Sequence, residues 1–527
     1  MSADTVLPPF GPLTRRQLLK RSASGLLLAA TSAVPLPSIA QGGRPVLTHG
    51  IQSGDITETS AILWSRSDRP ARMVVEVAAT EQFRDARRLL GPVALENTDF
   101  TAKLRVTDLP AGQEVFYRVS FVGLDSDRAT SEPQIGRLRT APAPNGKPNR
   151  AVSFVWTGDT AGQGWGINEE WGGMRGYETM LRNRPDFLIN SGDCVYSDGV
   201  IPAEVKLADG TLWKNRTTEA KSKVAETLEE FRGNFRYNLL DTHYRKMMAE
   251  TPMLVQWDDH ETTNNWYPEE ILEDSRYTVK SVPLLSARAN QAFREYMPIR
   301  EFDDEPGRVY RKISYGPLLD IFVIDMRTYR GNNTANRQER PGPDTAFLGA
   351  AQMAWLKREL ESSRATWKVF AADMPIGLIV PDGNAMEAIA NGDGPPLGRE
   401  FEIADLLRFL KQRDIRNTLW LTADVHYTAA HHYDPARAQF KEFLPFWEFV
   451  SGPIHAGTFG PNRIDPTFGP EVRFIKDGGG KSNLPPSDGL QFFGHVRIAP
   501  DTRVLTVTLK DIADRSLYTV DLTPQRR

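Results

Sequence analysis

The pattern of apolar and polar residues changes near residue 141 of this 527-residue chain. Before that point, short runs of β-branched and aromatic residues are separated by polar turns, which is typical of half-buried strands. The clearest runs are Ser60–Trp64, Met73–Val77 and Val115–Val119. Several short strands within about a hundred residues predict a small β-sandwich of the fibronectin or immunoglobulin type over residues 44–140.

After a Pro-containing linker at Ala141–Gly146, apolar runs alternate with helical patterns. The apolar residues between Ile403 and Leu410 are spaced to share one face of a helix, and Asn168–Arg182 also has helical character. This alternation predicts a layered α/β domain over residues 150–522. Its predicted buried strands are Val152–Trp156, Phe187–Ile189, Met253–Trp257, Ile321–Ile324, Val369–Ala372 and Leu419–Thr422.

Two segments depart from this alternation. Residues 200–250 are rich in charge and periodic from Ala220 to Phe231, which predicts a helical insertion. Thr458–Asp488 is dense in Gly and Pro and is expected to form a long surface loop. Val504–Leu509 and Leu517–Leu522 then end the chain as strands, and no internal repeat is present.

Composition narrows the function classes. The chain has 64 Lys and Arg against 67 Asp and Glu, a net charge of −3, so no stable nucleic-acid binding is expected. Its single cysteine, Cys194, excludes an internal disulfide and a Cys-based zinc cluster. We expect that thiol to be packed in the interior.

The N-terminal segment resembles a twin-arginine (Tat) signal over residues 1–40. Arg15 and Arg16 precede the short apolar run Ser24–Ala33, and Ser38–Ala40 supplies small residues for cleavage. Such a signal implies export through the Tat machinery to the periplasm or the medium; the alternative is a merely basic, disordered tail. The apolar run is too short to cross a bilayer, and no later segment is apolar enough, so no transmembrane segment is expected in the mature chain.

Acidic residues follow the predicted strands repeatedly. One Asp after a strand is usually a helix cap or a turn residue, and Ser53-Gly54-Asp55 repeats the tripeptide Ser191-Gly192-Asp193 in another context. Here several predicted strands are each followed by an Asp, and some of them also by a His or Tyr. This repetition indicates that the side chains gather at one edge of a sheet. The candidates are Asp159; Asp193 and Tyr196; Asp259, His260 and Asn264; Asp373; and Asp424 and His426.

These residue types suit hard or borderline metal ions, and no sulfur ligand is needed. Two metals about 3.5–4 Å apart can clamp a phosphoryl group and supply a hydroxide near neutral pH. The protein then needs no covalent nucleophile of its own, which agrees with the absence of a Gly-x-Ser-x-Gly elbow. No Walker-type phosphate loop is present either.

The motifs resemble those of PhoD-like alkaline phosphatases and, more distantly, purple acid phosphatases. Gly192–Tyr196 matches their Gly-Asp-x-x-Tyr motif, and Trp257–Glu261 followed by Asn264 resembles the PhoD-like Trp-Asp-Asp-His-Glu-x-x-Asn signature. Further matching segments are Ile324–Arg330, Glu448–Pro453 and His49–Asp55. The resemblance spans nearly the whole mature chain. It implies a four-layer αββα metallophosphoesterase domain and an exported phosphomonoesterase or phosphodiesterase that uses Fe(III) and Ca(II).

The resemblance also implies a ligand set. Asp193 would bridge the two metals, and Asp159, Tyr196 and His426 would hold the iron. The second metal would take Asp259, Asn264 and Asp424. Characterised PhoD-like enzymes use a Cys near the first strand, whereas this chain has Thr157-Gly158-Asp159, so the exact metal set is open. Asp373 lies where purple acid phosphatases carry a His, and its role as a ligand is equally open.

Other residues allow two interpretations. His260 is either a general acid or phosphate donor, or a residue that orients a neighbouring ligand. Arg327 either clamps phosphate or pairs with a carboxylate such as Asp325. His431 and His432 face opposite sides of a strand, and we expect a surface role for them; His455 has no assignable role.

Several functions fit the same motifs. We expect a phosphoesterase in which a metal-bound hydroxide attacks phosphate monoesters or diesters in line. A phospholipase D-like or nucleotide phosphodiesterase is an alternative on the same site, since a fold does not fix the substrate. A non-catalytic binding protein stabilised by metal is the alternative from a different class.

Overall fold

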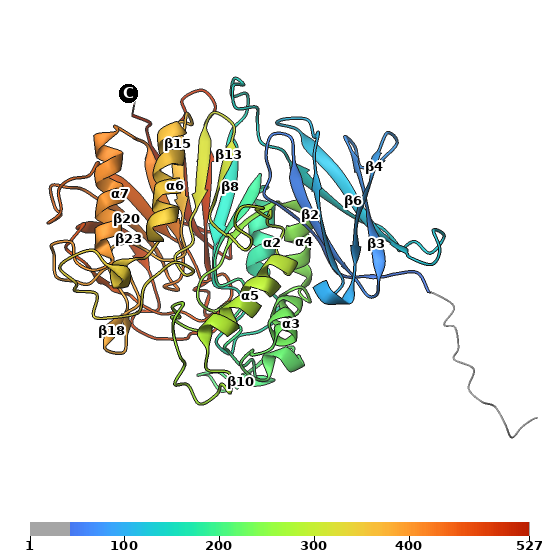
Figure 1. Cartoon of the computed structure of the whole chain (residues 1–527), viewed down its shortest axis with the longest axis horizontal. Helices are drawn as coiled ribbons and strands as arrows, with labels where there is room; N and C mark the ends of the chain where they lie inside the picture. Colours follow the sequence, from blue (N-terminus) through green and yellow to red (C-terminus); the bar gives the residue numbers. More distant parts are fainter. Residues whose placement is uncertain (1–42, 526–527) are drawn as a thin grey trace, which may run out of the picture. The chain divides into compact units, whose positions relative to one another are not determined.

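Two mixed β-sheets form the centre of the computed structural model, which describes residues 43–525 (Figure 1). The predicted signal segment, residues 1–40, lies outside the described residues. No described helix is long and apolar enough to cross a membrane.

The first part of the chain folds into the expected β-sandwich. One of its layers is β1 (Leu47–Gly54), β2 (Ala61–Ser67) and β5 (Thr101–Val106). The other is β4 (Arg87–Ala94), β3 (Ala71–Ala78), β6 (Glu114–Gly123) and β7 (Gln134–Arg139).

The sandwich is joined edge to edge with the following domain. β1 pairs in parallel with β12 (Met253–Gln256) through Gly54 and Met253. A Cβ on Gly54 would lie 2.5 Å from the carbonyl oxygen of Pro298, so only glycine permits this close approach. The next residue, Asp55, is buried and paired with Arg311 at 2.7 Å. The segment Ser53-Gly54-Asp55 is therefore a structural joint.

The larger sheet has nine strands and the second sheet has seven. In order across the nine-stranded sheet lie β26 (Ser516–Leu522), β25 (Leu505–Asp511), β24 (Phe492–Ile498), β8 (Val152–Thr157), β9 (Phe187–Ser191), β12, β1, β2 and β5. The seven-stranded sheet runs β13 (Arg311–Tyr315), β14 (Leu319–Val323), β15 (Trp367–Ala371), β19 (Thr418–Thr422), β21 (Phe446–Val450), β20 (Thr428–Tyr433) and β23 (Pro470–Lys476).

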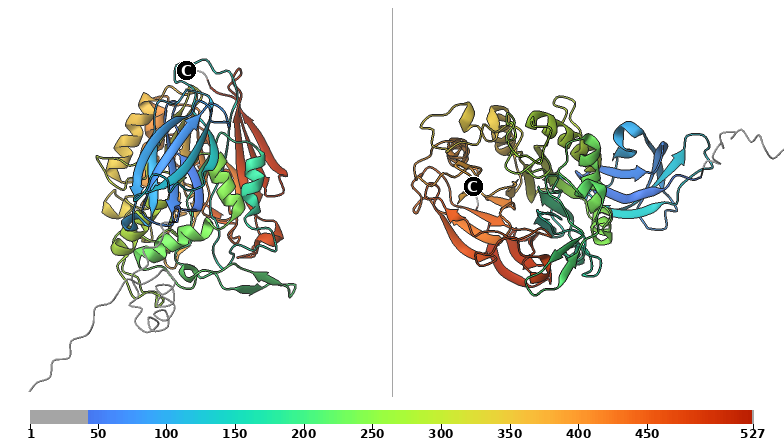
Figure 2. Two further views of the ribbon diagram at one scale, coloured as in Figure 1. Left: turned by 90° about the vertical axis from the view of Figure 1, so that its right-hand side faces the viewer. Right: turned by 90° about the horizontal axis from the view of Figure 1, so that it is seen from below.

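Strand periodicity builds the layers. In β8, Phe154 and Trp156 pack in the core between the sheets, while Val155 packs with the helices outside. The same alternation holds in β14, where Phe322 faces outward. On the nine-stranded side lie α2 (Arg175–Arg182), α3 (Leu228–Asn238), α4 (Thr242–Glu250) and α5 (Val282–Tyr296), and on the other side α6 (Gly349–Ser362) and α7 (Glu400–Gln412) (Figures 1 and 2). The predicted αββα sandwich is confirmed.

Two predicted helical segments are shorter than expected. Asn168 forms turns in which its carbonyl accepts from the backbone N–H of Gly172 and Gly173, so helix α2 begins only at Arg175. The insertion at 200–250 starts with a hairpin of β10 (Glu204–Lys206) and β11 (Leu212–Lys214), which projects from the sheets in Figure 2. Its first α-helix, α3, begins after the capping box of Thr227.

The expectation of a long surface loop at Thr458–Asp488 is confirmed only after Lys476 and is wrong for the part before it. The segment contains β22 (Arg463–Ile464), which pairs with β16 (Leu378–Ile379), and β23, which is the edge strand of the seven-stranded sheet. Asp465 and Phe468 within it are fully buried. Gly and Pro here shape bends that let a chain segment pack inward, which composition alone does not distinguish from an exposed loop.

The surface role expected for His431 is also wrong. Its side chain is buried and its Nδ1 donates to Glu448 Oε2 at 2.9 Å, whereas His432 is half-buried on the other face of the strand.

Glu400, at the start of α7, gives a prediction about stability. Burial and the neighbouring Asp465 raise its pKa to about 10, so the folded protein keeps this carboxyl protonated where an unfolded chain ionises it. The unfolding free energy should therefore fall as pH rises between the two pKa values, by about 1.4 kcal/mol per pH unit from this group. Glu400→Gln, which stays neutral, should remove that contribution.

Urea midpoints measured at about pH 6 and pH 9 check this. Wild type should lose more stability between the two than Glu400→Gln, and the exposed control Glu339→Gln should behave like wild type. An equal loss in wild type and Glu400→Gln would contradict the assignment.

Candidate metal centre and active site

The acidic residues follow the carboxyl ends of parallel strands in both sheets, and these two edges lie beside each other. β8, β9 and β12 are parallel in one sheet, and β14, β15 and β19 are parallel in the other. The indole of Trp156 donates to the carbonyl of Thr422 at 3.2 Å and links the two edges. Following these strands are Asp159, Asp193, Asp258, Asp259, Asp373 and Asp424, all buried or, for Asp424, half-buried.

Unusual backbone angles turn these side chains inward. Asp159, Asp193 and Asp424 have φ of 59°, 49° and 65°, the left-handed region that Asp tolerates better than most residues. Gly192 has φ 98°, and a Cβ there would lie 2.5 Å from the Cβ of Asp258. The strand-to-loop turn can thus bring Asp193 against the next strand end.

The first group consists of Asp159, Asp193 and His426, whose ligand atoms lie within 4.8 Å of one another. His426 Nδ1 donates to the carbonyl of Gly457, which leaves Nε2 to face Asp159 Oδ1 at 3.8 Å and Asp193 Oδ2 at 4.0 Å. The Tyr196 hydroxyl donates to the same nitrogen at 2.9 Å. Carboxylates, imidazole and phenol therefore converge.

Two further groups extend this one. Asp193 also lies with Asp259 and His260, and Asp259 in turn lies with Asp258 and Asp424, each set within 4.8 Å. Asp193 and Asp259 thus each belong to two adjoining groups, and Asp193 is the one that the family resemblance implies as the bridging ligand.

His260 is fixed by its surroundings. Its Nδ1 donates to Asp198 at 2.8 Å, and its ring stacks on Tyr196 with centroids 4.3 Å apart. Burial lowers the pKa of His260, but the charges of Asp198, Asp259 and Asp193 outweigh burial and raise it well above 6.5. These carboxylates thereby favour the imidazolium form of His260.

The electrostatics of the centre call for a cation. Burial and the charge of Asp258 raise the pKa of Asp159, Asp373 and Asp424 well above the ordinary range, and burial with Asp259 does the same for Asp193. Both carboxylate oxygens of Asp159 and of Asp373 are buried without a hydrogen-bond partner. Native proteins rarely leave such atoms unsatisfied, and metal ions would satisfy them. The residues present fit a metal centre.

Arg327 lies behind the centre and is fully buried. Its guanidinium pairs with Asp258 and Glu387, each at 2.5 Å, and reaches Asp373 at 3.6 Å. Asp325, the partner expected from sequence, accepts instead from the backbone N–H of Arg327. Arg327 therefore pairs with carboxylates, as one of the two interpretations expected, and its positive charge lies on the inner side of the acidic cluster.

Asn264 is exposed, unlike the buried candidate ligands, and its backbone N–H donates to Asp198 at 2.9 Å. With Tyr196 and His260 it lines a cavity of about 710 Å³ in front of the centre. The neighbouring Asn265 donates its backbone N–H to Asp259 at 2.6 Å.

Three residues that contact the predicted site residues were not selected from the sequence. Asp198 lies two residues after Tyr196, and Asp258 directly precedes Asp259, so proximity to the motifs could have indicated both. Glu387 follows no strand motif, and only the tertiary structure brings it to Arg327. Cys194 is buried, with Sγ 3.4 Å from Asn190 Oδ1, as expected for a packed thiol.

The PhoD-like phosphatase family model matches residues 154–509, which is most of the chain, and the model of the PhoD-like phosphatase N-terminal domain matches residues 31–142. The chain belongs to the PhoD-like phosphatase family. Members of this family are phosphoric ester hydrolases, and the buried acidic and histidine groups are consistent with a metal site in such an enzyme.

Relatives agree with this assignment. Alkaline phosphatase D of Bacillus subtilis (strain 168) is 27% identical over 489 residues, which cover 86% of this chain and 79% of that protein. The solved structure of PhoD superposes with a TM-score of 0.68 at 21% identity, covering 92% of this chain and 90% of that one. Purple acid phosphatase PPD1 from yellow lupin (Lupinus luteus) seeds gives 0.55 at 10% identity, covering 91% and 74%. At these identities the two structures support the fold of this PhoD-like phosphatase.

Proposed function

We propose that this PhoD-like phosphatase is an exported, metal-dependent phosphodiesterase that also accepts monoesters. The observation that carries metal dependence is the set of buried carboxylates with unpartnered oxygens that meet at Asp193. A protein without a cation there would bury several like charges around one histidine and one arginine.

The proposed metal pair is Fe(III) with Ca(II). Asp159, Tyr196 and His426 would hold the iron, and Asp259, Asn264 and Asp424 would hold the second ion, with Asp193 between them. When bound, the metals would polarise the phosphoryl group and activate water. Asp373 has free oxygens but also lies beside Arg327, so it would serve either the second metal or the arginine.

The side chains around the metals would orient the substrate. His260, held by Asp198, would donate a hydrogen bond to a phosphoryl oxygen or a proton to the leaving group. Arg327 is enclosed by carboxylates, so in this proposal it positions Asp258 and does not bind phosphate.

Charge in the front cavity supports a preference for diesters. Its wall carries Asp198, Glu270, Glu273 and Asp274, while Arg276 pairs with Asp274 at 2.6 Å. An acidic wall disfavours the dianion of a monoester more than the monoanion of a diester. A phospholipase D-like or nucleotide phosphodiesterase, which are the alternatives on this site, would also act on diesters and would fit the same acidic wall.

Turnover of p-nitrophenyl phosphate and bis-p-nitrophenyl phosphate tests the proposed activity. We expect a higher kcat/KM for the diester, loss of both activities with EDTA and their recovery with added metal. Asp193→Asn should lower turnover more than about a hundredfold, while the exposed control Asp344→Asn should not. Faster monoester turnover would refute the diester preference, and hydrolysis of neither ester would refute the enzyme.

Iron is tested by colour and elemental analysis. Fe(III) bound to a tyrosinate absorbs visible light, so the holoprotein should show a band that Tyr196→Phe removes. Tyr267→Phe, a change in the same cavity, should keep the band. Active protein that contains no iron would rule the iron assignment out.

Export is tested by cell fractionation. We expect wild type in the periplasmic fraction or the medium, and retention in the cytoplasm when Arg15→Lys and Arg16→Lys are combined. Arg21→Lys is the matched control outside the arginine pair. Normal export of the double variant would contradict a twin-arginine route.

A further inference from the structure

A second cavity lies at the opposite ends of the strands that carry the metal-centre residues. It has a volume of about 690 Å³. Among its lining residues, 363–366 lead into β15 and Lys368 lies within that strand. Arg416 and Asn417, which also line the cavity, directly precede β19. The acidic residues Asp373 and Asp424 follow the other ends of these two strands. The cavity shares no lining residue with the cavity in front of the metal centre.

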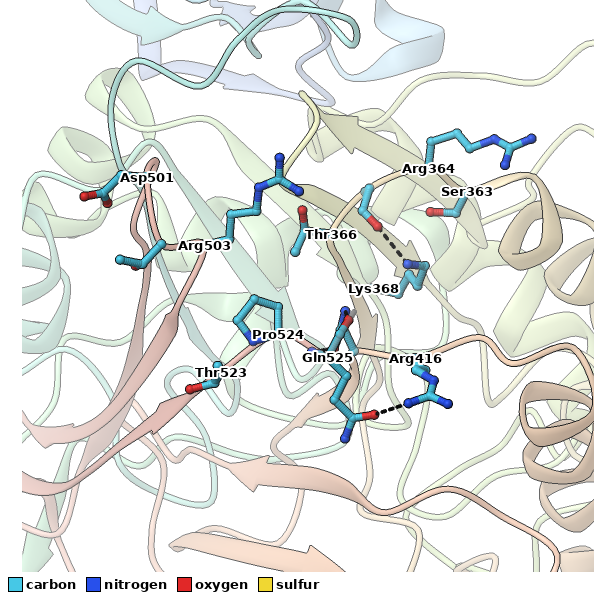
Figure 3. Close-up of a pocket in the computed structure, with 13 residues that line it drawn as sticks. Ser363, Arg364, Thr366, Lys368, Arg416, Asp501, Arg503, Thr523, Pro524 and Gln525 are labelled. Atoms are coloured by element: carbon cyan, nitrogen blue, oxygen red, sulfur yellow. Dashed lines mark hydrogen bonds between the residues drawn. The ribbon is translucent and has the colours of Figure 1, made fainter. Parts of the chain in front are cut away.

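Basic side chains predominate in the lining of this cavity, and one of them, Arg416, pairs with Asp414 at 2.6 Å. Arg364, Lys368, Arg416 and Arg503 line it, and Asp501 is the one acidic residue among its described lining residues (Figure 3). In Figure 3 the guanidinium of Arg503 points toward Thr366, while the Asp501 carboxylate points away from the cavity. Within the described residues, neither Arg364 nor Arg503 forms an ion pair.

The walls of the cavity are held in place by hydrogen bonds. Asn417 donates its side-chain amide to the carbonyl of Gln525 at 3.1 Å and accepts from the backbone N–H of Gln525 at 2.8 Å. The indole of Trp367 donates to the carbonyl of Arg503 at 2.8 Å. Lys368 is buried, and its ammonium donates to the carbonyl of Ala365 at 2.7 Å. The backbone at Arg503 and the ammonium of Lys368 are thus held in place, while the side chains of Arg364 and Arg503 are exposed to solvent and accessible to a ligand.

An aromatic cavity adjoins the basic one. It has a volume of about 300 Å³ and shares Arg416, Asn417, Thr523 and Gln525 with its neighbour. Trp447 and His432 lie on its wall with ring centroids 4.8 Å apart. Further lining residues are Trp367, Phe446, Val520 and Leu522, and the acidic Asp521, which accepts a hydrogen bond from the Thr506 hydroxyl. A cationic cavity beside an aromatic one is complementary to an anion that carries an apolar or aromatic group.

We propose that these adjoining cavities form a second ligand site, which binds organic phosphates away from the metal centre. The phosphate would lie among Arg503, Arg364 and Lys368, where charged N–H donors can pair with its oxygens. The organic group would pack against Trp447 and His432. Each cavity falls in or near the size range of small-molecule sites. The proposal does not rest on the proposed phosphodiesterase activity.

Calorimetric titration of the holoprotein with phenylphosphonate tests the proposal, because its carbon–phosphorus bond is not an ester and is not hydrolysed. We expect two classes of site in wild type. The combination of Arg364→Ala and Arg503→Ala should weaken one class about tenfold or more. Arg105→Ala with Arg497→Ala removes the same charge from two exposed positions and should keep both classes. Turnover of bis-p-nitrophenyl phosphate should be the same in all three proteins.

Comparison of probes tests the organic part of the ligand. Inorganic phosphate and methylphosphonate should bind the second site more weakly than phenylphosphonate. His432→Ala should weaken phenylphosphonate about threefold or more and leave methylphosphonate unchanged. A single class of site in wild type, or equal titrations of the two double-arginine variants, would overturn the second site. Equal affinities for all three probes would overturn its selectivity for organic phosphates.

Discussion

Mutual repulsion among buried carboxylates is the constraint around which this protein is built. Asp159, Asp193, Asp258, Asp259 and Asp424 belong to overlapping groups whose ligand atoms lie within 4.8 Å of one another, and all but the half-buried Asp424 are buried. Repulsion at such distances in a poorly screened interior is far larger than at a surface. Arg327, His260 and the proposed metals supply the opposite charge, and two sheets hold the carboxylates in register against it.

The two Ser-Gly-Asp tripeptides show how the environment decides what a motif does. Burial would raise the pKa of Asp55, but Arg311 and Arg300 outweigh it and lower that pKa, so the carboxylate becomes half of a structural ion pair. Asp193 meets other carboxylates and a histidine, and its pKa rises. The first tripeptide joins the β-sandwich to the catalytic sheet, and the second places the candidate bridging ligand.

Charge is also segregated along the strands of the seven-stranded sheet. β15 and β19 run from the basic cavity at Lys368 and Asn417 to the acidic centre at Asp373 and Asp424. Because the strands between are apolar and packed on both faces, the two ends are separated by a dry core. A cation and an organic anion can therefore be accommodated by one sheet without competing for the same groups.

The sequence by itself determined which strands end in candidate ligand residues, and it indicated the family. Apolar runs indicated the buried strands, and an Asp follows each strand that leads to the metal centre. Asp159, Asp193, Asp259 and Asp424 could therefore be selected from local pattern alone. The β-sandwich and the alternating domain were also predictable, since period-two and helical patterns are local properties. Local pattern failed for the part of Thr458–Asp488 up to Lys476 and for His431, where long-range packing buries residues that composition places at a surface.

Only the tertiary structure decided which groups meet. It brought Glu387 and Asp258 onto Arg327, Asp198 onto His260, and Asp465 beside Glu400, contacts between residues many positions apart. It also joined the basic wall of Arg364 and Arg503 from segments more than a hundred residues apart. Such contacts depend on how two sheets pack face to face, and no local spacing along the chain encodes the distance between them.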